Sequence, residues 1–151
     1  MTEREFWMLI DVIDTDLLDE GDEDAALAPL LRLLQGKQES DLAGFDEILA
    51  QKLYALDGRE YAKHAGESGE SGDGFLYARC YVVAQGEAYY KEVLTTPEKM
   101  PNTLDQWCEP LLFIHLHAWA EHTGKDEAEW EFETSVSYET GSHTELWSPQ
   151  E

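Results

Sequence analysis

Basic residues are scarce in this sequence. Its 151 residues include 10 lysines and arginines against 33 aspartates and glutamates, which gives a formal net charge of −23 at pH 7. Such a charge repels phosphate backbones and anionic membrane surfaces, and it attracts basic partners over a Debye length of about 10 Å. Basic patches with interleaved aromatic residues are also missing. We therefore expect no binding to nucleic acid or membrane, and either a basic partner or solubility alone explains the charge.

Cysteine, export signals and long apolar runs are equally scarce. The two cysteines, Cys80 and Cys108, are not spaced as a CxxC motif, so we expect two reduced thiols packed in the core. No basic segment followed by an apolar run opens the chain, and the apolar stretch 111–120 is too short to span a bilayer. These absences predict a cytoplasmic protein.

The common catalytic and ligand-binding motifs are absent as well. The sequence contains no GxSxG, GxxxxGKS or GxGxxG motif, and its histidines do not form HExxH. The acidic run from Asp14 fails the register of a calcium-binding EF-hand loop, because Leu18 and Asp19 stand at loop positions 5 and 6. We therefore predict no metal, no cofactor and no catalytic residue. Whether the protein is an enzyme is left open, with a non-enzymatic role favoured.

Regularly spaced apolar residues predict a helical domain. Hydrophobic residues make up 42% of the chain, enough for the core of one domain. Thr2 and Glu5 form a capping box at the first helix, and a later helix begins with Pro110 and closes with Gly124 in the left-handed conformation. The second helix contains Pro29, so it either begins just before this residue or is kinked. The predicted helices cover residues 2 to about 21, 22–35, 40–56 with Ser40 as the cap, 59–64, 86–94 and 110–122.

Three other segments give different patterns. Residues 65–74 are rich in glycine and contain no apolar anchor, so they are interpreted as a mobile loop. Residues 75–85 fit either a strand or a buried helix, and the helix is favoured because Asp73 and Gly86 stand at its ends. Residues 130–138 alternate between apolar and polar side chains and are the best strand candidate. The predicted fold is mainly α: a single compact domain over residues 1–151, with about six helices and an irregular C-terminal segment containing at most one or two short strands.

The acids are concentrated towards the two ends of the chain. Eight lie between Asp11 and Asp24 and another eight between Asp126 and Glu151, and neither segment contains a lysine or arginine. Such clusters predict one or two anionic faces rather than an evenly charged surface. The predicted partner-binding face consists of Asp14, Asp16, Asp19, Glu20, Asp22, Glu23 and Asp24.

Arg79 is the only charged residue in the run 75–85. If this run is buried, the guanidinium must pair with a carboxylate or with backbone carbonyls. A structural salt bridge is the main interpretation of Arg79, and a ligand-binding arginine is the alternative.

Three sequence blocks resemble a bacterial family known as domain of unknown function 4240. They are Phe6-Trp7-x-Leu9-Ile10-Asp11, then Asp73-Gly74-Phe75-Leu76-Tyr77-Ala78-Arg79 with Gln85-Gly86, then Ser137-Tyr138-Glu139-Thr140-Gly141-Ser142 with Trp147. The resemblance covers nearly the whole chain and implies a small, mainly helical bacterial protein, without an assigned activity, cofactor or catalytic residue. The family pattern often carries asparagine where this chain has His143. Polar residues within these blocks suggest a polar pocket formed by Asp11, Arg79, Glu139, Thr140 and Ser142.

These observations favour a non-catalytic binding protein that neutralises a basic partner, in particular the cytoplasmic immunity protein of a bacterial toxin. A dense carboxylate surface can imitate a phosphate backbone and occupy the cationic cleft of a nuclease. One alternative is a hydrolase that uses carboxylates and one of His115, His117 or His122, with or without a bound transition metal. The other is a regulatory module that acts through protein contacts.

Overall fold

The structure is a computed structural model that describes residues 1–149. All regular elements within this range are helices, six of them with eight or more residues, so the prediction of a mainly α domain with about six helices is confirmed. The α-helices are α1 (Glu3–Ile10), α2 (Thr15–Asp19), α3 (Glu23–Gln35), α4 (Glu39–Ala55), α5 (Arg59–Lys63), α6 (Gly72–Ala84), α7 (Glu87–Thr95), α8 (Ile114–Thr123) and α9 (Thr144–Trp147). The 3-10 helices are η1 (Gly66–Glu70), η2 (Pro97–Lys99), η3 (Glu109–Phe113) and η4 (Glu127–Glu129).

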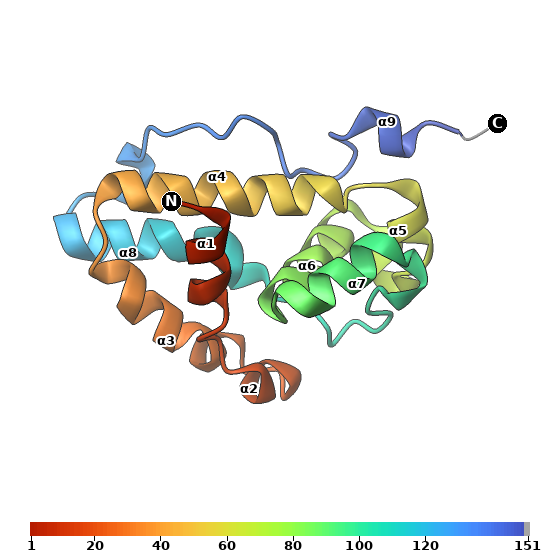
Figure 1. Cartoon of the computed structure of the whole chain (residues 1–151), viewed down its shortest axis with the longest axis horizontal. Coiled ribbons are helices and arrows are strands. Elements are labelled where there is room, and N and C mark those ends of the chain that lie inside the picture. Colours follow the sequence, from red (N-terminus) through yellow and green to blue (C-terminus); the bar gives the residue numbers. More distant parts are fainter. Residues whose placement is uncertain (150–151) are drawn as a thin grey trace.

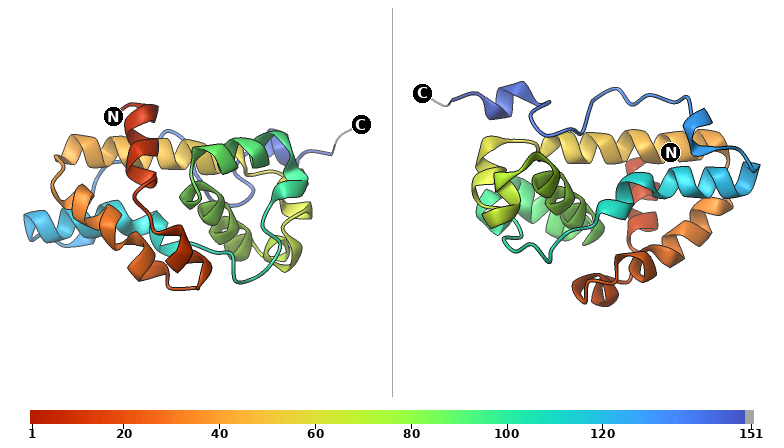
Figure 2. Two further views of the ribbon diagram at one scale, coloured as in Figure 1. Left: turned by 60° about the horizontal axis from the view of Figure 1, so that its bottom comes forward. Right: turned by 180° about the vertical axis from the view of Figure 1, so that it is seen from behind.

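Helix α4 runs along most of the molecule and joins two groups of helices (Figure 1). Helices α1, α3 and α8 gather near its first half, and α5, α6 and α7 near its second half. Helix α3 packs along α8, and α8 and α6 both contact α4. Figure 1 and the right-hand view of Figure 2 show the C-terminal segment on the opposite side of α4 from α2. No helix in residues 1–149 is both long enough and apolar enough to cross a bilayer.

The N-terminal segment forms two helices where the sequence predicted one. Thr2 Oγ1 accepts a hydrogen bond from the Glu5 amide at 3.1 Å, as expected for the cap of α1. The helix ends at Ile10, and Asp14 then caps α2 by accepting from the Leu17 amide at 3.2 Å. The Asp14 amide donates to the Ala26 carbonyl at 3.0 Å, which holds this turn against α3. A side chain that caps a new helix competes with continuation of the old one, so the single helix to residue 21 was wrong.

Helices α3 and α4 begin slightly differently from the prediction. Helix α3 starts at Glu23 and continues through Pro29, so it does not begin just before the proline. Helix α4 starts at Glu39 with Gln38 as its N-cap residue, which places Ser40 inside the first turn rather than at the cap. The end of α8 follows the prediction, because Gly124 takes the left-handed conformation with φ 74°.

Residues 65–74 are helical rather than a loop. Residues 66–70 form η1 and residues 72–74 belong to the first turn of α6. Ser68 is buried and its hydroxyl accepts from Trp107 Nε1 at 2.9 Å. Gly69 allows η1 to approach α5 closely, since a Cβ there would lie 2.0 Å from the Ala62 carbonyl oxygen. Glycine thus allows close packing here rather than mobility. The prediction looked for an apolar anchor and missed Ser68, the polar side chain that holds the segment.

Residues 130–138 are extended but belong to no strand within the described chain, so the strand candidate was wrong. Exposure nevertheless alternates at every residue, with the apolar side chains partly buried and the intervening ones exposed. The segment, which we call the strap (residues 130–139), lines a pocket together with residues of α4, η3 and α8. The alternating polarity therefore arises because one face of the strap packs on helices. Among residues 1–149 the strap has no neighbouring strand, which a sheet requires.

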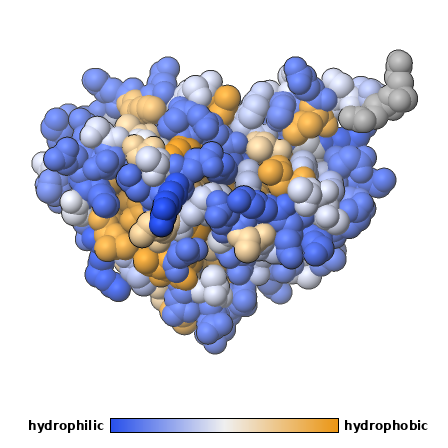
Figure 3. Space-filling model, in the orientation of Figure 1, coloured by the Kyte–Doolittle hydropathy of each residue, from blue (hydrophilic) through white to orange (hydrophobic). Residues whose placement is uncertain are grey.

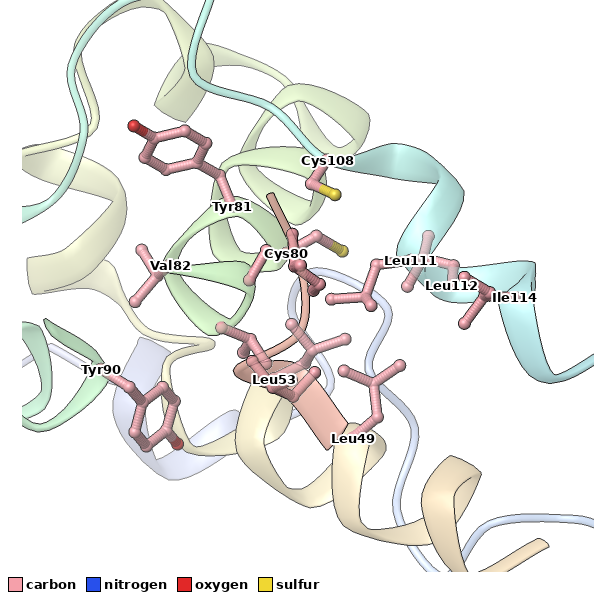
Figure 4. Packing of buried hydrophobic residues seen from close by; sticks show 14 of the residues in the cluster. Leu49, Leu53, Cys80, Tyr81, Val82, Tyr90, Cys108, Leu111, Leu112 and Ile114 are labelled. Carbon is pink, nitrogen blue, oxygen red and sulfur yellow. The ribbon is translucent and has the colours of Figure 1, made fainter. Parts of the chain in front are cut away.

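Helix α6 lies in the core, which confirms the helical interpretation of residues 75–85. Both thiols are buried and free. Figure 4 shows Cys80 and Cys108 close to apolar side chains of α4, η3 and α8, among them Leu49, Leu53 and Leu111. Burial of α6 on nearly all sides explains why residues 75–85 show no helical polarity pattern.

Candidate functional site

The predicted partner-binding acids lie together on α2, on the turn after it and at the start of α3 (the acidic surface). This region is the lowest part of the molecule in Figure 1, and hydrophilic residues cover its tip in Figure 3. Six of the seven acids are exposed and Glu23 is partly buried. None of them has a lysine, arginine or histidine nitrogen within 4.0 Å in the described chain. The charge of this surface is therefore not neutralised by a cation within residues 1–149.

Some of these acids also stabilise the helices that carry them. Asp14 caps α2, and Asp22 caps α3 by accepting from the Ala25 amide at 3.3 Å. Glu23 and Asp24 occupy the first turn of α3, where the helix dipole favours negative charge. Asp16 also lies in a first turn, that of α2. The carboxylates of Asp16 and Glu20 have no hydrogen-bond partner among the described residues.

The acidic surface borders a groove that the sequence did not predict. The groove has a volume of about 460 Å³ and lies between α2, the start of α3 and the loop before η3. Asp19 forms part of its wall and accepts from Tyr81 Oη at 2.7 Å and from Gln85 Nε2 at 3.0 Å. Burial raises the pKa of Glu23 above its usual value, and the charges of Glu109 and Asp24 add to this effect. We call it the acidic groove, and its lining consists of Asp19, Glu20, Gly21, Glu23, Leu104, Asp105 and Trp107.

Sequence reasoning missed the residues that close this groove. Leu104 is 48% exposed, and Trp107 is held by its bond to Ser68 and by an edge-on contact with Tyr77 at 5.4 Å between ring centroids. Asp105 belongs to neither acidic cluster of the sequence. No periodic pattern marks residues 104–107, and only the tertiary fold brings them to α2.

Arg79 is fully buried and hydrogen-bonded to oxygen atoms of two distant segments. Its guanidinium donates to the carbonyl oxygens of Leu53 at 2.9 Å and Tyr138 at 3.0 Å, and to Thr140 Oγ1 at 3.0 Å. It also lies 4.7 Å from the centroid of the Phe75 ring. No carboxylate within the described chain lies in ion-pair distance, so carbonyls and a hydroxyl replace the expected salt bridge. Burial lowers the pKa of Arg79, while the nearby charge of Asp57 acts in the opposite direction.

Asp57 fixes the C-terminal segment beyond the strap. Its carboxylate accepts from the amides of Gly141 and His143, both at 3.0 Å, and from Trp147 Nε1 at 2.7 Å. The ring of His143 stacks on Tyr54 with centroids 4.0 Å apart, and its Nδ1 lies 3.0 Å from the Tyr54 carbonyl. Asp57 is outside the three sequence blocks and was not predicted.

The predicted polar pocket is only partly assembled. Arg79 and Thr140 are hydrogen-bonded, and Thr140 Oγ1 also donates to the Gly72 carbonyl at 2.7 Å. Glu139 is exposed, and its carbonyl accepts from the Ser142 amide at 3.1 Å in the same turn. Asp11 is exposed at the end of α1, where its carboxylate lies near Gly86, and it has no hydrogen bond to the other four in residues 1–149. The group therefore joins the strap to α6 and leaves Asp11 apart.

A second hollow, the strap pocket, has a volume of about 460 Å³ and lies beneath the strap. Asp46 of α4 and His115 of α8 meet in its wall, with His115 Nε2 3.5 Å from Asp46 Oδ2. Both are buried, and neither His115 Nδ1 nor Trp130 Nε1 has a partner at normal hydrogen-bond distance within residues 1–149. Trp130 nevertheless lies close enough to the Asp46 carboxylate to lower its pKa in part. Burial raises the pKa of Asp46 to about 6 and lowers that of His115 to about 4. The other lining residues are Leu112, Phe113, Leu116 and residues 132–139.

The histidines considered for metal chemistry do not converge. His115 lines the strap pocket, while His117 borders a different hollow between α3 and α8 and its Nδ1 contacts Glu127. His122 is exposed. No group of three or more histidine, cysteine, aspartate or glutamate side chains within residues 1–149 is arranged to hold a metal ion.

Comparison with known proteins adds one finding. No curated protein and no solved structure matches the chain significantly. A family model described as a protein of unknown function (DUF4240) matches residues 1–138, which is most of the chain. This range includes α1, the whole of α6 and nearly all of the strap. The chain therefore belongs to the DUF4240 family.

Proposed function

We propose that this protein is a cytoplasmic binding protein that neutralises a basic partner protein, and specifically the immunity protein of a bacterial toxin. The observation that carries the proposal is the acidic groove, where four carboxylates surround an exposed leucine and a tryptophan and no lysine or arginine of the described chain contributes to the lining. The exposed acids of α2 and α3 extend the same negative surface beyond the groove.

The groove is suited to the side chain of a lysine or arginine. The methylene groups of such a side chain would pack on Leu104 and Trp107 while its charge meets Asp19, Glu23 or Asp105. A guanidinium can also lie over the indole face of Trp107, a contact of about 0.5–2 kcal/mol. A groove of this composition binds a basic side chain better than a flat acidic surface, because it accommodates the apolar stem as well as the charge.

The wider charge supports an antagonist of a nuclease-like toxin. Nucleases need cationic clefts to hold phosphates, and a surface with the charge of a phosphate backbone would be drawn into such a cleft. Electrostatic attraction of this kind mainly accelerates association, while the buried centre of an interface controls dissociation.

The test is to measure binding to the product of the neighbouring gene at low and high salt, with wild type and two variants. The first variant, Asp14→Asn/Asp16→Asn/Asp19→Asn/Glu20→Gln, removes four charges from the acidic surface and keeps the side-chain oxygens that cap α2 and meet Tyr81. The matched control, Glu60→Gln/Glu67→Gln/Glu70→Gln/Glu145→Gln, removes four exposed charges from α5, η1 and α9. Both variants have the same net charge, so they differ only in where the charge is lost.

We expect the association rate of the wild type to fall about tenfold or more at high salt. The acidic-surface variant should associate slowly even at low salt, and the control should behave nearly as the wild type. Equal affinity for wild type and acidic-surface variant at both salt concentrations would refute the acidic surface as the binding site. No binding to any neighbouring gene product would leave solubility as the explanation of the charge.

A further inference from the structure

The strap pocket contains polar groups that the acidic groove does not explain. The two hollows share no lining residue, and Figures 1 and 2 show the strap and α2 on opposite sides of α4. His115 is 3% exposed, yet its Nδ1 has no hydrogen-bond partner in the described part of the chain. A buried polar atom without a partner costs about 1–3 kcal/mol, so it indicates that a partner is missing.

We propose that the strap pocket binds a primary organic ammonium group that carries a short apolar chain. This inference does not depend on the proposed function, because it concerns a different surface.

Hydrogen-bond chemistry indicates an ammonium group. His115 Nε2 faces the Asp46 carboxylate, so the ring proton belongs on Nε2 and Nδ1 is left as an acceptor. Asp46, when ionised, is also an acceptor. Trp130 Nε1 is a donor in the same wall, and it lies beside the Asp46 carboxylate. The wall therefore offers mainly acceptors to a bound group, and an ammonium has three N–H donors. It would neutralise the charge of Asp46.

The charge of the lining favours the same ligand. Asp46, Glu133 and Glu139 line the pocket, and none of the lining residues is a lysine or arginine. A carboxylate or phosphate ligand would meet three acids and no compensating cation. An organic cation would have complementary charge at the buried end and at the rim, where Glu133 and Glu139 are exposed.

The remaining walls explain the need for an apolar chain. Phe113, Trp130, Phe132 and Tyr138 contribute aromatic rings, and Leu112, Leu116 and Val136 contribute aliphatic groups. Aromatic faces attract cations and bury the methylene groups next to them. A hydrated inorganic cation would gain nothing from these walls.

Two sets of hydrogen bonds hold the strap in place over the pocket. Glu47 accepts from the amide of Ser135 at 2.7 Å and from its hydroxyl at 2.6 Å. Arg79 donates to the Tyr138 carbonyl at the other end of the pocket wall. A pocket formed before the ligand arrives avoids the entropic cost of ordering the strap on binding.

The test is a titration of the isotope-labelled protein with butylammonium chloride, followed by nuclear magnetic resonance of the Trp130 indole N–H and the His115 ring. n-Butanol has the same apolar chain without charge, and butyrate has the opposite charge. Nα-acetyl-lysine methylamide presents the same ammonium on a peptide-like backbone. Binding of the lysine derivative as tightly as butylammonium identifies a partner's lysine side chain as the natural ligand, and binding of butylammonium alone identifies a free amine.

We expect saturable shifts of both signals with butylammonium, with a Kd of about 1–10 mM as for a ligand of few atoms. Asp46→Asn should weaken binding about tenfold. If Asp46→Asn does not fold, Glu133→Gln/Glu139→Gln is compared with Glu129→Gln/Glu131→Gln, which removes two strap-region charges that do not line this pocket. The first pair should weaken binding more than the second.

Three results would overturn the proposal. One is the absence of saturable shifts with butylammonium. Another is equal binding of n-butanol, which would make the pocket a general apolar hollow. The third is unchanged affinity in Asp46→Asn, or equal affinity in the two double variants.

Discussion

Replacement of Arg79 by methionine should destabilise the protein strongly. Arg79 is fully buried and donates three hydrogen bonds, to Leu53, Tyr138 and Thr140. Methionine fills a similar volume without a donor, so the Tyr138 carbonyl loses the hydrogen bond that joins the strap to α6. The negative charge of Asp57 also loses the cation nearby.

The size of the effect follows from these contacts. A hydrogen bond from a charged donor contributes about 1.5–3 kcal/mol, and removal of one member of a buried charged network costs about 3–5 kcal/mol in total. We expect a loss of about 4 kcal/mol in the free energy of unfolding. For a domain of this size that corresponds to a fall in Tm of about 10–15 °C.

Urea and thermal denaturation, followed by far-ultraviolet circular dichroism, would measure the loss. Arg79→Lys should fall between wild type and Arg79→Met, because it keeps the charge but cannot reach all three acceptors. The matched control is Arg32→Met on the exposed face of α3, where a change of less than about 0.5 kcal/mol is expected. If Arg79→Met is as stable as Arg32→Met, the guanidinium does not hold the strap and the reasoning fails.

Three further predictions concern the core, a close packing and pH. Both buried thiols should react with a thiol reagent only as fast as the protein unfolds, since burial raises the pKa of Cys80 to about 12 and also raises that of Cys108; rapid labelling of the native protein would contradict this. Gly69→Ala should cost about 3 kcal/mol because its Cβ would lie 2.0 Å from the Ala62 carbonyl, whereas Gly36→Ala, whose nearest atom lies at 3.6 Å, serves as a near-neutral control. Asp46 has its pKa raised from 3.8 to about 6, so the stability it contributes is complete below pH 3.8 and is lost as the pH rises through 6. Urea titrations from pH 4 to 7 should therefore show Asp46→Asn gaining stability relative to wild type as the pH rises. His115 contributes to the pH dependence in the opposite direction, but it does so equally in both proteins. A difference in the free energy of unfolding that stays constant with pH would contradict the burial of Asp46.

The helical fold was predictable because its signals are local. The cap at Thr2 and the left-handed Gly124 each involve a few consecutive residues, and the structure contains both. The strand prediction failed for a different reason. Residues 130–138 do alternate in burial, but a strand also needs a neighbouring strand, and that depends on the rest of the fold.

The same distinction applies to the candidate sites. The acidic surface was visible because its members are close in sequence and share α2 and α3. The groove depends on Asp105 and Trp107, and the strap pocket on Asp46 and His115, which are brought together only by packing of distant helices. No pattern within a single segment could predict either pair.

We expect the attachment of the C-terminal segment to form late in folding. Asp57 bonds to residues 84 to 90 positions further along the chain, so this attachment closes one of the longest loops in the molecule. Such closure has a high entropic cost and forms late, after the local helices. Substitutions that weaken these contacts should therefore accelerate unfolding and leave the folding rate nearly unchanged. We therefore expect the attachment of the C-terminal segment to set the lifetime of the folded protein.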